Sequence, residues 1–258
     1  MRGRLSSSMA PAEWRLLAWL EREGFDYEVY SDQQLHDGTL PLEVYQVLLI
    51  SVHPEYWSRQ MFERVQAWVA TGGRLVSLGG NCLNCEVELP DGKSMRCRTQ
   101  LLDVDGSLGM PDPADPTRWF DSRFHRTALP EAGLLGLATT ETGIMTAAPY
   151  RVLDASHWVY GGTGLRDGDI FGQASLQERC SGGASGHETD KRTAMTPSDF
   201  VSLAKGINPD DGGAEMVIRE SPGGGAVFNT GSITYVASLL VDEAVSTITS
   251  NVLRRFIS

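Results

Sequence analysis

Two short polar segments of the sequence follow apolar runs that are typical of buried strands. Residues 53–58 read His-Pro-Glu-Tyr-Trp-Ser and come directly after Val47–Val52, while residues 79–82 read Gly-Gly-Asn-Cys and come after Arg74–Leu78. The first segment offers an imidazole, a carboxylate and a phenol. The second offers an amide and a thiol beside glycines that let the backbone approach a ligand closely. Together these groups predict the floor of a small-molecule pocket.

His53 and Asn81 are the candidate ligand-binding residues of that pocket. His53 has an alternative role, since it could cap a helix or bond a backbone carbonyl. Tyr56 and Trp57 also have one, because aromatic residues in the first turn of an amphipathic helix usually pack in a core. The residue types leave both interpretations open.

A third polar segment, residues 181–191, reads Ser-Gly-Gly-Ala-Ser-Gly-His-Glu-Thr-Asp-Lys. It lacks the Gly-Lys-Ser/Thr ending of a phosphate-binding loop. His187 and Glu188 are the candidate catalytic residues, because an adjacent imidazole and carboxylate can supply a general base or a hard metal ligand. A solvated surface loop is the alternative.

The four cysteines are too few for a disulfide scaffold in a chain of 258 residues. Cys82 and Cys85 have the spacing of half a zinc motif, with Cys97 and Cys180 further along, but reduced, partly buried thiols are the favoured interpretation. Cys82 as a nucleophile is disfavoured, because it lacks the Gly-x-Cys-x-Gly frame of an amidotransferase.

The elements that must position these residues are readable from periodicity. Apolar residues at helical spacing predict a helix over Ala12–Glu23, and Gly24 is placed to end it. A strand is expected at Phe25–Tyr30. Strand, helix and strand then follow one another from Val47 to Leu78, with Ser58 as the helix cap, which is the pattern of a βαβ unit. Ligands bind at the carboxyl ends of such strands, so residues 53–58 and 79–82 should share one edge.

The fold class expected from this pattern is α/β, an open parallel sheet with flanking helices. Residues 1–11 are expected to form a flexible tail, and residues 12–258 a single domain with an irregular, loop- and strand-rich excursion over about 96–200. Later strands are expected at 200–204, 214–220 and 225–229, the last two as a hairpin, and a final helix after Asp242. No strand precedes the first helix, so either another segment pairs there or the chain is part of a longer one.

Composition limits the possible partners. Lys and Arg number 22 against 33 Asp and Glu, a formal net charge of −11. Binding to nucleic acid needs clustered positive charge and is therefore not expected. Neither an apolar signal region nor a run long enough for a membrane span occurs, so a cytoplasmic protein with no membrane partner is expected.

Several segments resemble one known family. Residues 17–25, residues 53–58, Gly79-Gly80-Asn81 and residues 186–190 resemble the C-terminal region of the large subunit of N,N-dimethylformamidase and its relatives. The resemblance covers most of residues 14–256, and the His-Pro-Glu-Tyr-Trp block is its most specific part. It implies a fold like class I glutamine amidotransferases and iron-dependent hydrolysis of small amides.

The resemblance also implies an iron ion held by two tyrosinates and one glutamate, hard ligands for a ferric Lewis acid. Tyr56 matches the tyrosine of the His-x-Glu-Tyr-Trp block and is the candidate iron ligand. Glu188, with His187, is the candidate for proton transfer. The second tyrosine belongs upstream of the first helix in the family. The ligand glutamate has no match in residues 111–121, whose acids are Asp112, Asp115 and Asp121.

The function expected is therefore iron-dependent hydrolysis of a small amide, with a homo-oligomer or a small partner subunit as possible assemblies. The alternative is a non-catalytic fragment or assembly domain with an incomplete metal site.

Overall fold

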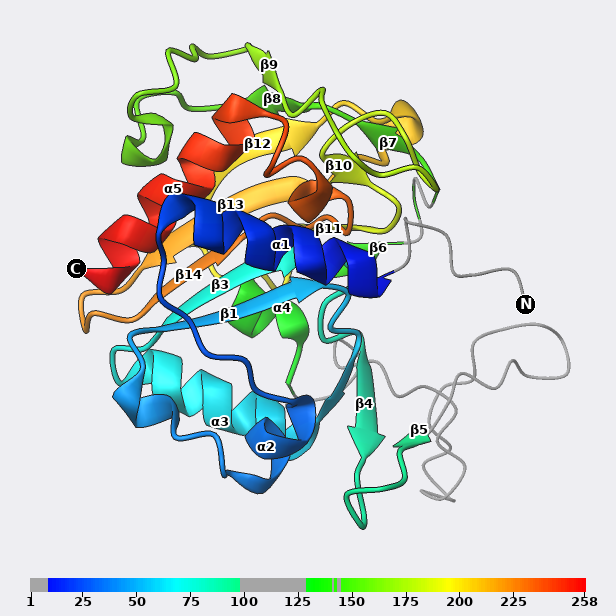
Figure 1. Cartoon of the computed structure of the whole chain (residues 1–258), viewed down its shortest axis with the longest axis vertical. Helices are drawn as coiled ribbons and strands as arrows, with labels where there is room; N and C mark the ends of the chain where they lie inside the picture. Colours follow the sequence, from blue (N-terminus) through cyan, green and yellow to red (C-terminus); the bar gives the residue numbers. More distant parts are fainter. Residues whose placement is uncertain (1–8, 98–128, 141, 143–144) are drawn as a thin grey trace, which may run out of the picture.

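The computed structural model describes residues 9–97, 129–140, 142 and 145–258 (Figure 1). Its elements in chain order, with η for a 3-10 helix, are α1 (Met9–Glu23), α2 (Asp32–Asp37), η1 (Leu42–Val44), β1 (Val47–Val52), β2 (Tyr56–Ser58), α3 (Arg59–Ala70), β3 (Arg74–Gly79), β4 (Cys85–Glu88), β5 (Arg96–Cys97), α4 (Glu131–Leu135), β6 (Ala138–Thr140), β7 (Ala147–Ala148), β8 (Tyr150–Val152), η3 (Trp158–Tyr160), β9 (Ile170–Phe171), β10 (Ser185–Gly186), β11 (Thr189–Lys191), β12 (Val201–Gly206), η4 (Pro209–Asp211), β13 (Glu215–Glu220), β14 (Ala226–Asn229), η5 (Tyr235–Ala237) and α5 (Glu243–Ile257).

The largest sheet is mixed rather than parallel. Within the described ranges it has the strand order β1-β3-β14-β13-β12-β8-β9. β1 is parallel to β3, and β3 is parallel to β14, with Arg74 opposite both Val47 and Ala226. Every other neighbouring pair in this sheet is antiparallel. The expected open parallel sheet of the glutamine amidotransferase class is therefore wrong, and the molecule is richer in β structure than that class.

The lengths of the connections explain the difference. A single crossover through α3 joins β1 to β3, and a crossover of this length lets two strands run parallel. β13 and β14 are joined by residues 221–225, where Ser221 N–H donates to the Gly225 carbonyl at 2.7 Å. Such a short turn can join only antiparallel strands. The hairpin was expected from the sequence, but its effect on the whole sheet was not.

The helix ends follow the capping residues that the sequence indicates. The Ser58 hydroxyl accepts from the Met61 N–H at the start of α3, and the Asp242 carboxylate accepts from the Val245 N–H at the start of α5. Gly24 follows the last residue of α1 with a φ of 73°, a left-handed conformation that glycine adopts without steric cost.

Two local predictions are wrong. Residues 25–30 run without regular secondary structure and pair with no strand in the part of the chain that the structure describes. Tyr56 and Trp57 lie in β2 rather than in the first turn of a helix, because β2 pairs with β4 in a separate three-stranded sheet. An alternating apolar pattern or an adjacent helix cap does not specify which segments pair with another strand.

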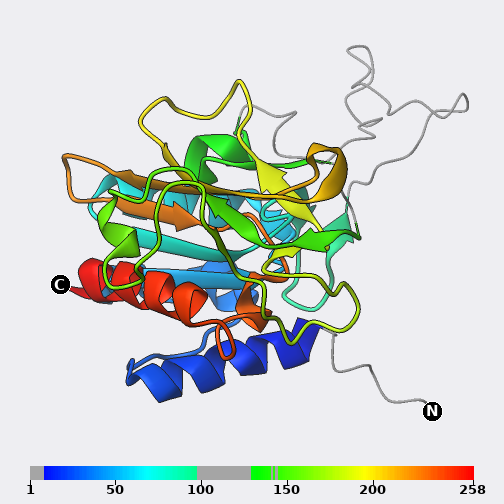
Figure 2. The ribbon, with the colours of Figure 1, turned by 90° about the horizontal axis from the view of Figure 1, so that it is seen from above.

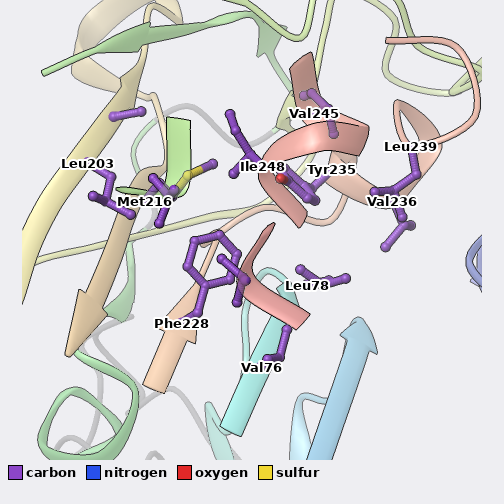
Figure 3. Packing of buried hydrophobic residues seen from close by; sticks show 14 of the residues in the cluster. Val76, Leu78, Leu203, Met216, Phe228, Tyr235, Val236, Leu239, Val245 and Ile248 are labelled. Atoms are coloured by element: carbon purple, nitrogen blue, oxygen red, sulfur yellow. The ribbon is translucent and has the colours of Figure 1, made fainter. Parts of the chain in front are cut away.

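Helices cover both faces of the large sheet, and each face has its own core. Figure 2 shows α1 and α5 side by side on one face, where the Trp19 indole N–H donates to the Ser246 hydroxyl at 2.8 Å. Val76 and Phe228 point to this face and Leu75 and Val227 to the other, as expected for alternate residues of a strand. Figure 3 shows the first core, with side chains of β3 and β14 packed against those of α5 and η5. Burying a large apolar side chain in this way contributes roughly 1.5–3 kcal/mol.

Among the described helices, none is long and apolar enough to cross a membrane.

Candidate functional site

The carboxyl ends of β1 and β3 bring the first two polar segments together, as expected for adjacent parallel strands. His53 follows the last residue of β1, and Asn81 lies two residues after β3. The Asn81 Nδ2 atom is 3.2 Å from His53 Nε2.

Three charged side chains converge beside this edge. His53 Nε2 lies 3.1 Å from Glu55 Oε2 and 3.3 Å from Glu188 Oε2, and all three side chains are at least three-quarters buried. Burial by itself would lower the pKa of His53. The hydrogen bonds and negative charges of Glu188 and Glu55 outweigh that effect and raise it to about 9. His53 is therefore an imidazolium at neutral pH, shared between two carboxylates.

Glu188 is ionised in this arrangement. The hydrogen bond from His53 lowers the pKa of Glu188, and this effect outweighs its partial burial. Asn81 Nδ2 donates to Glu188 Oε2 at 2.7 Å, and Asn81 Oδ1 accepts from the Thr139 hydroxyl at 2.8 Å. These two bonds fix which end of the amide faces the carboxylate. Asn81 therefore orients Glu188.

A buried carboxylate holds the backbone beneath Asn81. Asp190 accepts from the Asn81 N–H at 2.8 Å, from the Cys82 N–H at 3.3 Å and from the Thr139 hydroxyl at 3.1 Å. It is 1% exposed. Burial raises the pKa of Asp190 to about 7, although these three hydrogen bonds act in the opposite direction. Asp190 thus ties the segment that carries Glu188 to the end of β3.

Backbone strain is concentrated at the same place. Val52, Asn81, Leu83 and His187 have φ angles of 63°, 52°, 55° and 68°. A β-branched residue such as Val52 is a clear outlier in the left-handed region, and each such residue costs roughly 1–2 kcal/mol. Residues strained in this way persist where surrounding contacts over-determine them, and they cluster at functional sites.

The close approach of two backbones requires Gly80. A Cβ atom at this position would lie 2.4 Å from the Glu188 carbonyl oxygen and 2.8 Å from the Ile233 nitrogen. Both neighbours are backbone atoms and cannot rotate away. The glycine therefore permits the contact that places Glu188 beside His53.

His187 and Glu188 are adjacent in sequence but differ in surroundings. The His187 side chain is 3% exposed, and no described residue bonds its Nδ1 atom. Burial lowers the pKa of His187, so this imidazole is neutral at pH 7. The Glu188 carboxylate contacts His53 and Asn81, whereas the His187 side chain makes no hydrogen bond to these residues. The structure does not support a solvated surface loop for this pair.

Tyr56 and Trp57 also separate. The Trp57 side chain is 1% exposed and packs in the core beneath α3, whereas Tyr56 is 42% exposed. The core interpretation thus holds for Trp57 but not for Tyr56, which presents its ring at the surface beside residues 53–55.

The described residues do not complete a metal site. They contain no group of three His, Cys, Asp or Glu side chains arranged to hold a metal ion. Residues 111–121, where the ligand glutamate was sought, lie outside the described ranges. Cys82, Cys85 and Cys180 are buried thiols, and none of them forms a disulfide within the described ranges. Burial raises the pKa of Cys82 well above its usual value, so its thiol is neutral and not an activated nucleophile.

Sequence reasoning missed the roles of Asp190 and Thr139. Both lie in segments without a recognisable motif for their contacts, and Thr139 is 51 residues from Asp190. The one available signal was the position of Asp190 two residues after Glu188, which places both side chains close to one another in an extended segment.

Comparison with known proteins gives one family and two curated relatives. The family model described as "N,N-dimethylformamidase beta subunit-like, C-terminal" matches residues 2–247. The N,N-dimethylformamidase beta subunit of Alcaligenes sp is 28% identical over 292 residues, which cover 96% of this chain and 37% of the relative. That of Paracoccus aminophilus is 27% identical, with 95% and 36% covered. The chain therefore spans little more than a third of the length of these relatives.

Among solved structures, the N-terminal domain of mmIFT52 is similar with a TM-score of 0.45 and 11% sequence identity, over 100% of this chain and 93% of that one.

Proposed function

The chain belongs to the N,N-dimethylformamidase beta subunit-like, C-terminal family, and we propose that it serves the hydrolysis of a small amide at the site formed by His53, Asn81 and Glu188. The observation that carries the proposal is the pairing of the His53 imidazolium, after the end of β1, with the ionised carboxylate of Glu188, which Asn81 binds after the end of β3. Such a pair offers both a proton donor and a proton acceptor to one substrate.

The proposed reaction uses the chain's own side chains for each proton. A water molecule beside Glu188 attacks the amide carbonyl carbon, forming the new C–O bond, and Glu188 accepts the water proton. His53 donates a hydrogen bond to the carbonyl oxygen as negative charge develops on it. The C–N bond then breaks, and the departing nitrogen receives the proton that Glu188 took up. The products are a carboxylic acid and an amine.

The cation of His53 also adjusts the strength of Glu188 as a base. A carboxylate whose pKa is lowered binds a proton weakly, so it returns that proton readily to the amine. The Asn81 side-chain amide is hydrogen-bonded to Glu188 and Thr139, so Asn81 acts as a positioning residue in this reaction. His187 stays a prediction for a second proton acceptor, supported by its neutral ring and unbonded Nδ1 atom.

Iron enters the proposal only through Tyr56. The described residues supply one tyrosine of the expected ligand set and do not complete it, so no step above is assigned to a metal. Tyr56 is 42% exposed, which leaves its phenol oxygen accessible to a cation. Tyr56→Phe should lower the iron content of purified protein and remove the visible absorbance of an iron tyrosinate, while the melting temperature stays close to that of the wild type.

The experiment that tests hydrolysis compares Glu188→Gln with the wild type. N,N-dimethylformamide is the probe, because the curated relatives carry its name, and amine release is measured after expression with iron. Loss of the proton acceptor should lower kcat at least about 100-fold. Glu63→Gln, an exposed carboxylate on α3, is the matched control and should keep full activity. Equal activity of Glu188→Gln and wild type would contradict the assignment.

A second candidate function is a non-catalytic assembly domain. It is favoured by the naming of the relatives as beta subunits, which implies a further subunit for those proteins. Wild-type protein that binds iron and still releases no amine, alone or with a partner subunit, would favour this function over hydrolysis.

A further inference from the structure

β1 lies at one edge of the large sheet. β1 is the first strand of the large sheet and pairs only with β3 among the described strands. Its sequence, Val-Leu-Leu-Ile-Ser-Val, contains no charged residue and no proline. Sheet edges of natural proteins are normally blunted by a lysine, a proline, a bulge or a covering element, because an apolar edge binds other strands.

A second segment, residues 26–30, lines the same cavity as β1. Residues 26–30 have no regular secondary structure, and no backbone hydrogen bond joins them to β1 within the described chain. Both segments line one cavity of about 950 Å³. We call this cavity the β1 groove; apolar side chains of α1, α5 and β1 line much of it, including Leu16, Leu17, Val47, Leu49, Leu253 and Ile257.

The charged side chains around the β1 groove are mainly acidic. Glu13, Asp26, Glu28 and Asp32 line it, and no Lys or Arg among the described residues does. Partial burial raises the pKa of Asp32. Partial burial and the negative charge of Asp32 together raise the pKa of Glu13. Glu13 and Asp32 therefore repel one another. The cation in the lining, His53, is already paired with Glu55 and Glu188, so a positively charged occupant would relieve this repulsion.

We propose that the β1 groove is a docking site for an extended strand of a partner polypeptide whose side chains alternate between apolar and basic. The backbone of this strand pairs with the outer edge of β1, its apolar side chains cover the cavity wall, and its basic side chains meet the acidic rim. A second copy of this chain is a poor occupant, because it would bring the same carboxylates and a net charge of −11 to an acidic surface.

The groove also adjoins the candidate functional site. His53 and Pro54 form part of its wall. A docked strand therefore lies against the segment that positions the His53 imidazolium. Docking is nevertheless independent of the proposed hydrolysis, since it depends on β1 and the acidic rim and not on Glu188.

The test uses the full chain and three short synthetic peptides with blocked ends. In the first, lysine alternates with valine; in the second, glutamate replaces lysine; the third repeats the first with alternate backbone nitrogens methylated, which removes the donors on one edge. Binding is measured by fluorescence anisotropy, and hydrogen exchange of the β1 amides is followed in parallel. The lysine peptide should bind and slow exchange in β1. The methylated peptide and the glutamate peptide should each bind at least about tenfold more weakly.

A protein variant tests the rim separately. Asp26→Asn combined with Asp32→Asn should weaken the binding of the lysine peptide about five- to tenfold at low salt. The loss of affinity should be smaller at high salt. Asp210→Asn, an exposed carboxylate in η4, is the matched control and should leave binding unchanged. Equal binding of the methylated and unmethylated peptides would overturn strand addition. Equal binding of the lysine and glutamate peptides, or dimerisation of the chain through β1, would overturn the proposal that the partner strand is basic.

Discussion

β1 carries the candidate site at its carboxyl end and the β1 groove along its outer edge, and acidic groups behave differently in the two places. At the site, Glu188 has a cationic partner in His53, and its pKa is lowered. In the groove, Asp32 and Glu13 have no cationic partner among the described lining residues, and their pKa values are raised. The contrast teaches that burial raises the pKa of a carboxylate unless a neighbouring cation outweighs it.

The two places also differ in their backbone. At the site, close contacts hold four left-handed residues and three hydrogen bonds converge on Asp190. Along the groove, residues 26–30 and β1 line one cavity, and no backbone hydrogen bond joins them within the described chain. A strained region with many hydrogen bonds is typical of a preorganised site, whereas an unpaired edge is typical of a surface that another strand completes.

The largest expected effect comes from adding one methyl group at the site. Gly80→Ala places a Cβ atom 2.4 Å from the Glu188 carbonyl oxygen, and two backbone segments must separate to accept it. We expect a loss of about 3 kcal/mol in the free energy of unfolding, measured by urea denaturation.

Gly223→Ala is the matched control, because a Cβ atom at that position in the β13–β14 turn meets nothing within 4 Å. Its effect should stay within about 0.5 kcal/mol. If the two variants unfold at the same urea concentration, the close approach at Gly80 does not hold the site together.

A smaller effect is expected from titrating the imidazolium. The pKa of His53 is raised from 6.5 to about 9, so the folded state binds this proton more tightly than the unfolded state. Its contribution to stability is complete below about pH 6.5 and is lost as the pH rises through about 9. The free energy of unfolding should fall by about 2–3 kcal/mol across this window. Urea denaturation at a series of pH values measures the change.

His53→Gln should remove the pH dependence of the free energy of unfolding between about pH 6.5 and pH 9. A separate decrease between about pH 4 and pH 7 should persist in the variant, because the pKa of the buried Asp190 is raised from 3.8 to about 7. A His53→Gln protein with the same dependence between about pH 6.5 and pH 9 as the wild type would assign that dependence to another group.

The smallest effect on the free energy of unfolding is expected in the groove, and it is a gain in stability rather than a loss. Glu13→Gln removes one of the mutually repelling carboxylates and keeps a good helix former in α1. We expect a gain of at most about 0.5 kcal/mol in the free energy of unfolding, since solvent screens much of the repulsion. Glu188→Gln removes a paired carboxylate and should instead lower stability. Destabilisation by Glu13→Gln would show that Glu13 has a stabilising partner in the groove.

Local periodicity predicted much of the chain correctly. The strand at Val47–Val52 has the predicted bounds, and the helices after Ser58 and Asp242 begin at the predicted caps. The meeting of His53 with Asn81 was also predicted, because adjacent parallel strands fix which ends lie together. These features depend on short-range sterics, capping and one crossover, which neighbouring residues encode.

Only the tertiary structure decided the contacts between segments that are far apart in the chain. β14 lies parallel to β3 although some 150 residues separate them. This parallel pairing stands beside the antiparallel β13–β14 hairpin, and the two together make the sheet mixed. Glu188 reaches His53 and Asp190 reaches Asn81 over a similar separation. No local pattern encodes such pairings, because they follow from the packing of whole elements and from the free energy of burying them together. The sequence therefore determined the elements and the residue types available for chemistry, and the tertiary structure determined which carboxylates gained a cationic partner.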